Sequence, residues 1–248
     1  MRAKILHQLP EIFLAKEDEQ MENIVTEKQQ REAQLLEAFI NMVKSPDGDF
    51  EALGHLFKAA SDGYSLQLII DILSQEPQAK RAFKERPRLG NVDLEALHQL
   101  PKNTLGYHYA VHMLSNNLKV LSAKEIPDDD LAFLAVHTTE THDCWHVVTG
   151  CSTHITGEIE LEAFYVAQMS ASRFWLALLA KNLLKSTLQD IETSGDYMDA
   201  LCRGWLRGKQ AKLLFGIEWN KLWETPLAEV RDRLNLNRVP ETDRILSA

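Results

Sequence analysis

The sequence predicts an all-α protein that forms a single compact multi-helix domain, and three observations support this expectation. Apolar residues recur at helical spacing along most of the chain. The 248 residues include 11 glycines and 8 prolines, too few for the many turns of a sandwich or a barrel of short strands. No segment has the strict apolar–polar alternation of a half-buried strand. We therefore expect helices throughout, separated by short breaker clusters.

The expected helices lie between clusters of residues that break or begin a helix. A charged segment with an apolar stripe covers residues 17–44 and ends at Ser45-Pro46-Asp47-Gly48. Residues 86–90 are expected to form a linker, because the residue before a proline is pushed out of the helical region. Acidic residues 128–130 and Gly150 mark the two ends of the helix that carries the candidate site. Helices are expected over 50–60, 65–74, 104–118, 126–148, 158–185, 196–215 and 226–234.

The chain is expected to have two parts. Residues 1–45 form an N-terminal amphipathic helical segment, in which we read no chemistry and whose apolar stripe suggests packing or a partner helix. Residues 46–240 form the helical domain, and the candidate site lies at 142–158 within it.

Composition disfavours several classes of protein. With 27 basic and 36 acidic residues the net charge is −9, and no basic patch is visible, so we expect no nucleic-acid partner. Three cysteines cannot all pair, which is typical of free thiols in a reducing compartment. The N-terminus resembles neither a signal peptide nor a transit peptide, and the longest near-apolar run, 174–180, is too short to span a bilayer. We expect a cytoplasmic protein with at most peripheral contact at the inner membrane.

One segment, His142-Asp143-Cys144-Trp145-His146, carries residues suited to metal binding. Two histidines four apart on a helix project from the same face, so one cation can reach both imidazoles. Gly150 and Gly157 bracket a loop that can reverse the chain and return Glu158 to the first helix. The sequence therefore predicts a site made of two histidines and one carboxylate.

The donor set limits the metal and its role. Mixed nitrogen and oxygen ligands suit zinc best, then iron or manganese, and magnesium less well. Three protein ligands leave one coordination position open, as in catalytic metal sites. Asp143 is interpreted in three ways, as a fourth ligand, as a residue that orients a ligand, or as a general base.

The same residues carry a family resemblance. His142-Asp143-x-x-His146, followed after eleven residues by Glu158, resembles the H-D-x-x-H-x11-E signature of the Coq4 family of ubiquinone (coenzyme Q) biosynthesis proteins. Further similar segments extend the likeness over about residues 50–236: Arg86-Pro87-Arg88-Leu89, Leu100-Pro101-x-x-Thr104-Leu105-Gly106-x-x-Tyr109, Glu140, Trp205-x-x-Gly208 and Trp223-Glu224-x-Pro226-Leu227-x-x-x-Arg231.

The resemblance implies a helical, metal-binding protein of quinone biosynthesis. Its implied activity is the oxidative decarboxylation of a polyprenylated aromatic ring, in which removal of the ring carboxylate is coupled to hydroxylation of the same carbon. The implied metal residues are His142, Asp143, His146 and Glu158. The implied partners are a prenyl lipid, other quinone-biosynthesis proteins, a membrane surface and a second copy of the chain in a homodimer.

Three departures from the family pattern favour an alternative function. The family usually has a lysine where this chain has Glu162, a glutamate where it has Tyr165, and an arginine where it has Thr138. Fewer cations near the metal should weaken the binding of a substrate carboxylate or phosphate. The alternative is a prenyl-lipid-binding scaffold without catalysis of its own. A metallohydrolase is a third interpretation, although Asp143 stands where zinc proteases have a longer glutamate.

The segment after Glu158 is interpreted in two ways. It is apolar nearly all round over 161–184 and should be buried, either as plain core or as the wall of a tunnel for an isoprenoid tail. His108 and His112 are interpreted as core or surface histidines, and Cys144 as a packing residue. The candidate lipid-binding residues are Phe164, Phe174, Trp175 and Leu178.

Overall fold

The computed structural model describes residues 28–237 except 47, 124, 126, 171 and 190. Within this range all extended regular structure is helical, and the pairing of Thr104 with Pro226 is an isolated antiparallel bridge. The all-α prediction is therefore confirmed. None of the described helices is long and apolar enough to cross a bilayer.

The chain divides into two units, with the break after Ala60. The first unit contains a helix over 28–44 and α2 (Phe50–Ala60), whose bounds match the expected helix over 50–60. Residues 17–27 of the expected first helix lie outside the described part, and the proposed boundary at residue 45 stays a prediction.

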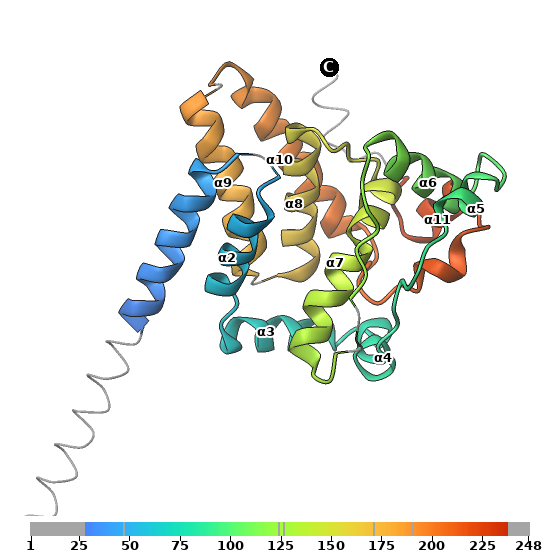
Figure 1. Cartoon of the computed structure of the whole chain (residues 1–248), viewed down its shortest axis with the longest axis horizontal. Helices are drawn as coiled ribbons and strands as arrows, with labels where there is room; N and C mark the ends of the chain where they lie inside the picture. The colour runs from blue at the N-terminus through green and yellow to red at the C-terminus, as the bar shows by residue number, and fades with distance from the viewer. Residues whose placement is uncertain are drawn as a thin grey trace, which may run out of the picture. The chain divides into compact units, whose positions relative to one another are not determined.

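The second unit holds the candidate site. Its elements are α3 (Gly63–Leu73), α4 (Pro77–Glu85), α5 (Leu94–His98), α6 (Leu105–Ser115), α7 (Asp130–Thr149), α8 (Ile155–Met169), α9 (Arg173–Gln189), η1 (Ile191–Thr193), α10 (Ser194–Gln210), η2 (Trp219–Leu222) and α11 (Leu227–Arg233). Helix α8 packs against both α9 and α10, and α6 and α11 pack against α7 (Figure 1). Helices α4 and α5 were not expected from the sequence.

Two glycines of α10 allow this helix to approach α8 closely. A Cβ atom on Gly204 would lie 1.9 Å from the carbonyl oxygen of Glu160, and one on Gly208 would lie 2.8 Å from that of Phe164. Side chains at these positions would force the two helices apart. The close contact fixes the position of α8, and with it the position of Glu158.

Glycines also shape the turn between α7 and α8. Gly150 adopts the left-handed conformation that ends many helices, with φ 77°, and its N–H donates to the carbonyl oxygen of His146. Gly157 lies so close to the loop that a Cβ there would be 2.2 Å from the carbonyl oxygen of Ser152. The predicted reversal between these two glycines is therefore present.

The prediction of a single helix over residues 158–185 is wrong. Helix α8 ends at Met169, Ser170 has φ 34°, and α9 begins at Arg173, where the Ser172 hydroxyl accepts from the N–H of Trp175. The chain reverses here and α9 packs back along α8. The expected burial of this segment is present for most of its apolar residues, among them Phe164, Trp175 and Leu178, whereas Leu176 and Leu184 on α9 are exposed.

Candidate metal centre

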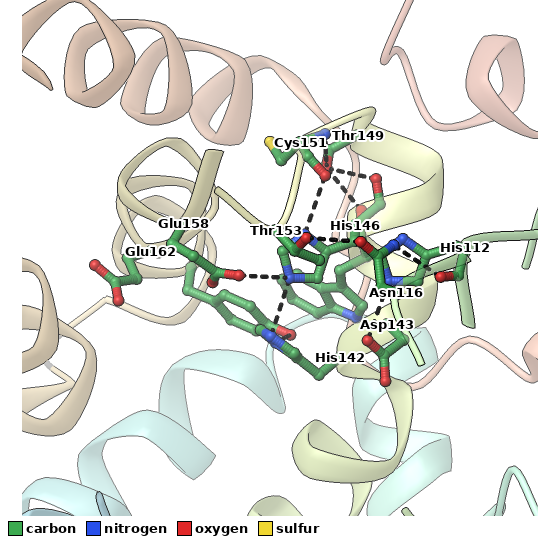
Figure 2. Close-up of polar contacts among 12 residues, drawn as sticks. His112, Asn116, His142, Asp143, His146, Thr149, Cys151, Thr153, Glu158 and Glu162 are labelled. Atoms are coloured by element: carbon green, nitrogen blue, oxygen red, sulfur yellow. Dashed lines mark hydrogen bonds and ion pairs between the residues drawn. The ribbon is translucent and has the colours of Figure 1, made fainter. Parts of the chain in front are cut away.

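The structure brings together the three residues that the spacing selected. His142 and His146 lie one turn apart on α7, and Glu158 reaches them from the first turn of α8 (Figure 2). One ligand atom from each lies within 4.8 Å of the other two. The Nε2 atoms of the two histidines are 3.2 Å apart, and Glu158 Oε1 is 3.5 Å from Nε2 of His146. We refer to these three residues as the His–His–Glu cluster.

His146 is held in one tautomer by the backbone. Its Nδ1 atom is 3.0 Å from the carbonyl oxygen of Cys151, which can only accept a hydrogen bond. Nδ1 therefore carries the proton and Nε2 offers its lone pair to the cluster. This is the arrangement in which an imidazole binds a metal through Nε2.

His142 is held by a side chain instead. Its Nδ1 atom is 3.3 Å from the hydroxyl oxygen of Tyr165, a buried residue of α8. Burial, with the nearby charge of His112, lowers the pKa of His142, and burial lowers that of His146 to about 3. Both rings are therefore neutral at pH 7, as metal binding requires.

Glu158 lies at the edge of the cluster, with about a third of its side chain exposed. Burial and the neighbouring charge of Asp143 raise the pKa of its carboxyl to about 7, and the positive charge of Lys181 opposes the shift. A cation between Glu158 and the two imidazoles would favour the carboxylate form.

Asp143 pairs with a histidine that the sequence analysis did not select. Its Oδ1 atom is 3.2 Å from Nε2 of His112 on α6, and the His112 ring stacks on His146 with centroids 5.4 Å apart. Burial opposes ionisation of Asp143, but the His112 hydrogen bond and the nearby histidines lower its pKa. Asp143 is not among the clustered ligand atoms. This geometry favours an orienting role, although that role stays a prediction.

Glu162 lies one turn beyond Glu158 on α8 and points away from the histidines (Figure 2). The Asn182 amide on α9 donates to both of its carboxylate oxygens, at 2.9 and 2.8 Å. Burial raises its pKa to about 8, against the positive charge of the buried Lys181. The presence of Glu162 where the family usually has a lysine had suggested that a positive charge is missing near the metal residues. Lys181 provides a positive charge near Glu158 and Glu162.

Three aromatic rings from three helices form a stack beside the cluster, here called the aromatic stack. Tyr165 of α8 lies between Trp145 of α7 and Trp175 of α9, with centroid distances of 4.1 and 3.9 Å and interplanar angles of 6°. Phe164 meets Trp145 edge-on.

The candidate lipid-binding residues lie in and around this stack, on α8 and α9. Phe164, Trp175 and Leu178 are buried, and Phe174 packs edge-on against Trp175. Their contact with a lipid stays a prediction.

The other residues that the sequence analysis considered, His108 and Cys144, lie outside the His–His–Glu cluster. His108 lies near Arg231, whose charge adds to burial in lowering its pKa. Cys144 is buried and burial raises its pKa. The interpretation of His112 as a plain core or surface histidine missed its pair with Asp143, and the sequence gave no sign of three other contributors: Lys181, Asn182 and the Cys151 carbonyl.

Known proteins are similar to this chain in sequence and in fold. Residues 21–240 match a family described as coenzyme Q (ubiquinone) biosynthesis protein Coq4. The mitochondrial ubiquinone biosynthesis protein coq4 of Aspergillus niger is 26% identical over 193 residues, which are 76% of this chain and 65% of that protein. The mitochondrial COQ4 homologue of Anopheles gambiae is 27% identical over 177 residues, 69% of this chain and 62% of that protein. The chain thus spans less than two thirds of the length of either relative.

A solved structure matches most of the chain. It is the crystal structure of a protein from Nostoc punctiforme PCC 73102, described as a candidate ubiquinone biosynthesis protein. Its TM-score is 0.75 and its sequence identity 29%, and the match covers 84% of this chain and 99% of that one.

Proposed function

The chain belongs to the Coq4 family of coenzyme Q (ubiquinone) biosynthesis proteins, and on that premise we propose that it acts on a polyprenylated aromatic ring precursor of a ubiquinone-type quinone. The proposed reaction is oxidative decarboxylation at the ring carbon that bears the carboxylate. The carboxylate would leave as CO2 and a hydroxyl would take its place, so the reaction also consumes a two-electron oxidant that supplies the oxygen atom, such as dioxygen. The chain would then be a metal-dependent decarboxylase and hydroxylase of a polyprenyl benzoate. The convergence of His142, His146 and Glu158 is the observation that carries this proposal.

The donor atoms fit one divalent metal ion, with zinc the best match to two imidazoles and a carboxylate. Nε2 of His146 presents a lone pair because Nδ1 is occupied by the Cys151 carbonyl. The Glu158 carboxylate offers further lone pairs 3.5 Å away, so a cation or a proton must lie among these atoms. Iron and manganese suit the same donors, and magnesium less well.

Each part of the site has a proposed task. A bound metal would supply a Lewis acid that draws electron density from the ring carboxylate as its carbon–carbon bond breaks. His142, His146 and Glu158 would hold it, and Asp143 would orient the site through its pair with His112. The buried aromatic stack keeps water from one side of the cluster.

The isoprenoid tail of the substrate is proposed to lie along the apolar part of α8 and α9. An aliphatic tail needs only a dry apolar surface, without specific hydrogen bonds. The proposed contacts are Phe164, Phe174, Trp175 and Leu178. All of these residues, like the cluster, fall within 46–240, which we propose as the functional domain.

The test combines metal content with function. Native mass spectrometry and elemental analysis would compare wild-type chain, purified without chelator, with His142→Ala. We expect one transition metal per chain in the wild type, its loss in the variant, and loss of complementation of a quinone-deficient strain. Complementation by a metal-free variant would contradict the catalytic proposal.

A lipid-binding scaffold of the same pathway is the second candidate. It is favoured by the departures at Thr138, Glu162 and Tyr165, none of which supplies a cation to bind the ring carboxylate of a substrate. In this case the metal would help to hold a head group. Isoprenoid that co-purifies with the chain, without turnover of a polyprenyl benzoate, would support the scaffold and exclude catalysis.

The family also suggests where the chain acts. We propose that it associates with other quinone-biosynthesis proteins, as a homodimer and with peripheral contact at a membrane. Sedimentation of the purified chain would show the dimer, and flotation with vesicles would show the membrane contact.

A further inference from the structure

The two histidines of the cluster differ in what holds the nitrogen that faces away from it. For His146 this partner is the Cys151 carbonyl oxygen, 3.0 Å from Nδ1. For His142 it is the Tyr165 hydroxyl, 3.3 Å from Nδ1. A carbonyl only accepts a hydrogen bond, whereas a hydroxyl both donates and accepts. His146 is therefore restricted to one tautomer and His142 is not.

The Tyr165 hydroxyl is held in place by the aromatic stack. The phenol ring lies between the indoles of Trp145 and Trp175, parallel to both within 6°. The His142 ring is nearly parallel to the same plane, at 19° to Tyr165 and 15° to Trp175. The phenol ring cannot turn without displacing an indole, so the hydroxyl oxygen stays beside Nδ1 of His142.

The contact between the two Nε2 atoms determines one tautomer of His142. Because His146 presents a lone pair at Nε2, the 3.2 Å contact is a hydrogen bond when His142 carries its proton on Nε2. Nδ1 of His142 then has a lone pair, which needs a donor. The Tyr165 hydroxyl is placed to donate to it.

Binding one metal through both Nε2 atoms requires the other tautomer of His142. The proton must then sit on Nδ1, and the same hydroxyl can accept it after its O–H bond rotates. The ring gains and loses no proton in total, because the proton only changes nitrogen. Neither arrangement leaves a buried nitrogen of His142 without a hydrogen-bond partner or a metal.

We propose that Tyr165 is a positioning residue that supports both tautomers of His142, as a donor to Nδ1 when the histidines bond to each other and as an acceptor from Nδ1 when Nε2 binds a metal. His146 is thus the fixed ligand and His142 the adjustable one. The inference rests on the proposed metal site, and it concerns residue 165, where this chain departs from its family.

The test measures tautomers directly. Imidazole nitrogen-15 NMR would be recorded on the full chain with and without zinc, for the wild type, Tyr165→Phe and Tyr197→Phe. We expect zinc-free wild type to show the Nε2–H form of His142 and the Nδ1–H form of His146, and zinc to convert His142 to Nδ1–H. Tyr197 is a matched control, because it is buried on α10 in an apolar cluster with Ile159 and Ala163.

Zinc affinity is the second readout, measured by competition with a chromophoric chelator. Tyr165→Phe keeps the stacked ring and removes the hydroxyl, so we expect about a tenfold weaker affinity, and a melting temperature lowered by a few degrees because Nδ1 of His142 loses its partner. The control Tyr197→Phe should bind zinc as the wild type does.

The possible outcomes separate the two proposals. A zinc-free wild type with His142 in the Nδ1–H form, or a Tyr165→Phe variant with unchanged affinity and tautomer, would overturn the role of Tyr165 and leave the metal site standing. If the wild type binds neither zinc nor iron nor manganese, the metal proposal fails, and the metal-free tautomer still decides whether Tyr165 donates to His142. The wild-type spectra need no variant, so the test survives if Tyr165→Phe does not fold.

Discussion

Helix α7 carries buried histidines in both of its halves, and their surroundings are opposite. In the first half, Nδ1 of His137 lies 3.2 Å from the Pro87 carbonyl oxygen, and Nε2 accepts from the Gly216 N–H at 3.1 Å. In the second half, His142 and His146 turn their Nε2 atoms toward each other and toward Glu158. Both nitrogens of His137 are therefore satisfied by backbone, while the Nε2 atoms of His142 and His146 face each other and Glu158.

The Glu140 carboxylate of α7 differs in the same way from the Glu158 carboxylate of the His–His–Glu cluster. Glu140 is enclosed by Arg88 and by the N–H groups of Leu89 and Ala123. Burial alone would raise its pKa, but the Arg88 hydrogen bond and the two N–H groups lower it. The comparison teaches that the partners of a residue, and not its type or its burial, distinguish a structural polar residue from a candidate ligand.

The largest expected effect would come from breaking the ion pair that encloses Glu140. Arg88→Met should lower the free energy of unfolding by about 3–5 kcal/mol, because it leaves the Glu140 carboxylate buried without its counter-charge. Urea denaturation of the zinc-free chain would measure this.

The neighbouring arginine offers a matched control. Arg86→Met removes a more exposed ion pair with Asp130 and should change stability by about 1 kcal/mol or less. The double variant Arg88→Met/Glu140→Leu should regain part of the loss, since neither charge is then left alone. Equal losses for Arg86→Met and Arg88→Met would contradict the structural role of the Arg88–Glu140 pair.

His137 predicts a dependence of stability on pH. Burial lowers its pKa to about 4, from 6.5 in the unfolded chain. Because the unfolded state takes up the proton first, the stability from neutral His137 is complete above pH 6.5 and is lost as the pH falls toward 4. About 3 kcal/mol should be lost by pH 4.

A variant isolates this contribution from that of the other buried histidines. The free energy of unfolding of wild type minus that of His137→Gln should shrink by about this amount between pH 7.5 and 4. A difference that stays constant with pH would mean that His137 is not held as a neutral ring.

Local signals in the sequence predicted the helices well where a residue imposes the backbone conformation. Gly150, at φ 77°, ends α7 as expected. The break at Ser170 has no glycine or proline, and apolar residues continue across it, so periodicity joined α8 and α9 into one helix. The chain turns there so that α9 can pack along α8, which is a tertiary effect.

Only part of the candidate site could be predicted from such local signals. His142, His146 and Glu158 are related by helical spacing and a short loop, both visible in sequence. His112 and Lys181 come from α6 and α9, and their approach depends on how these helices pack. Spacing along one chain segment cannot give contacts between helices that are far apart in sequence.

The smallest expected effect concerns Asp143, which either binds the metal itself or orients the residues that bind it. His112→Phe keeps a ring against His146 and removes the hydrogen bond to Asp143. We expect a loss of about 1–2 kcal/mol of stability, because the bond involves a charged group. Since Asp143 lies outside the clustered ligand atoms, zinc affinity should fall less than tenfold in the chelator competition, far less than in His142→Ala. A loss of affinity as large as that of His142→Ala would place the His112–Asp143 pair among the residues that hold the metal.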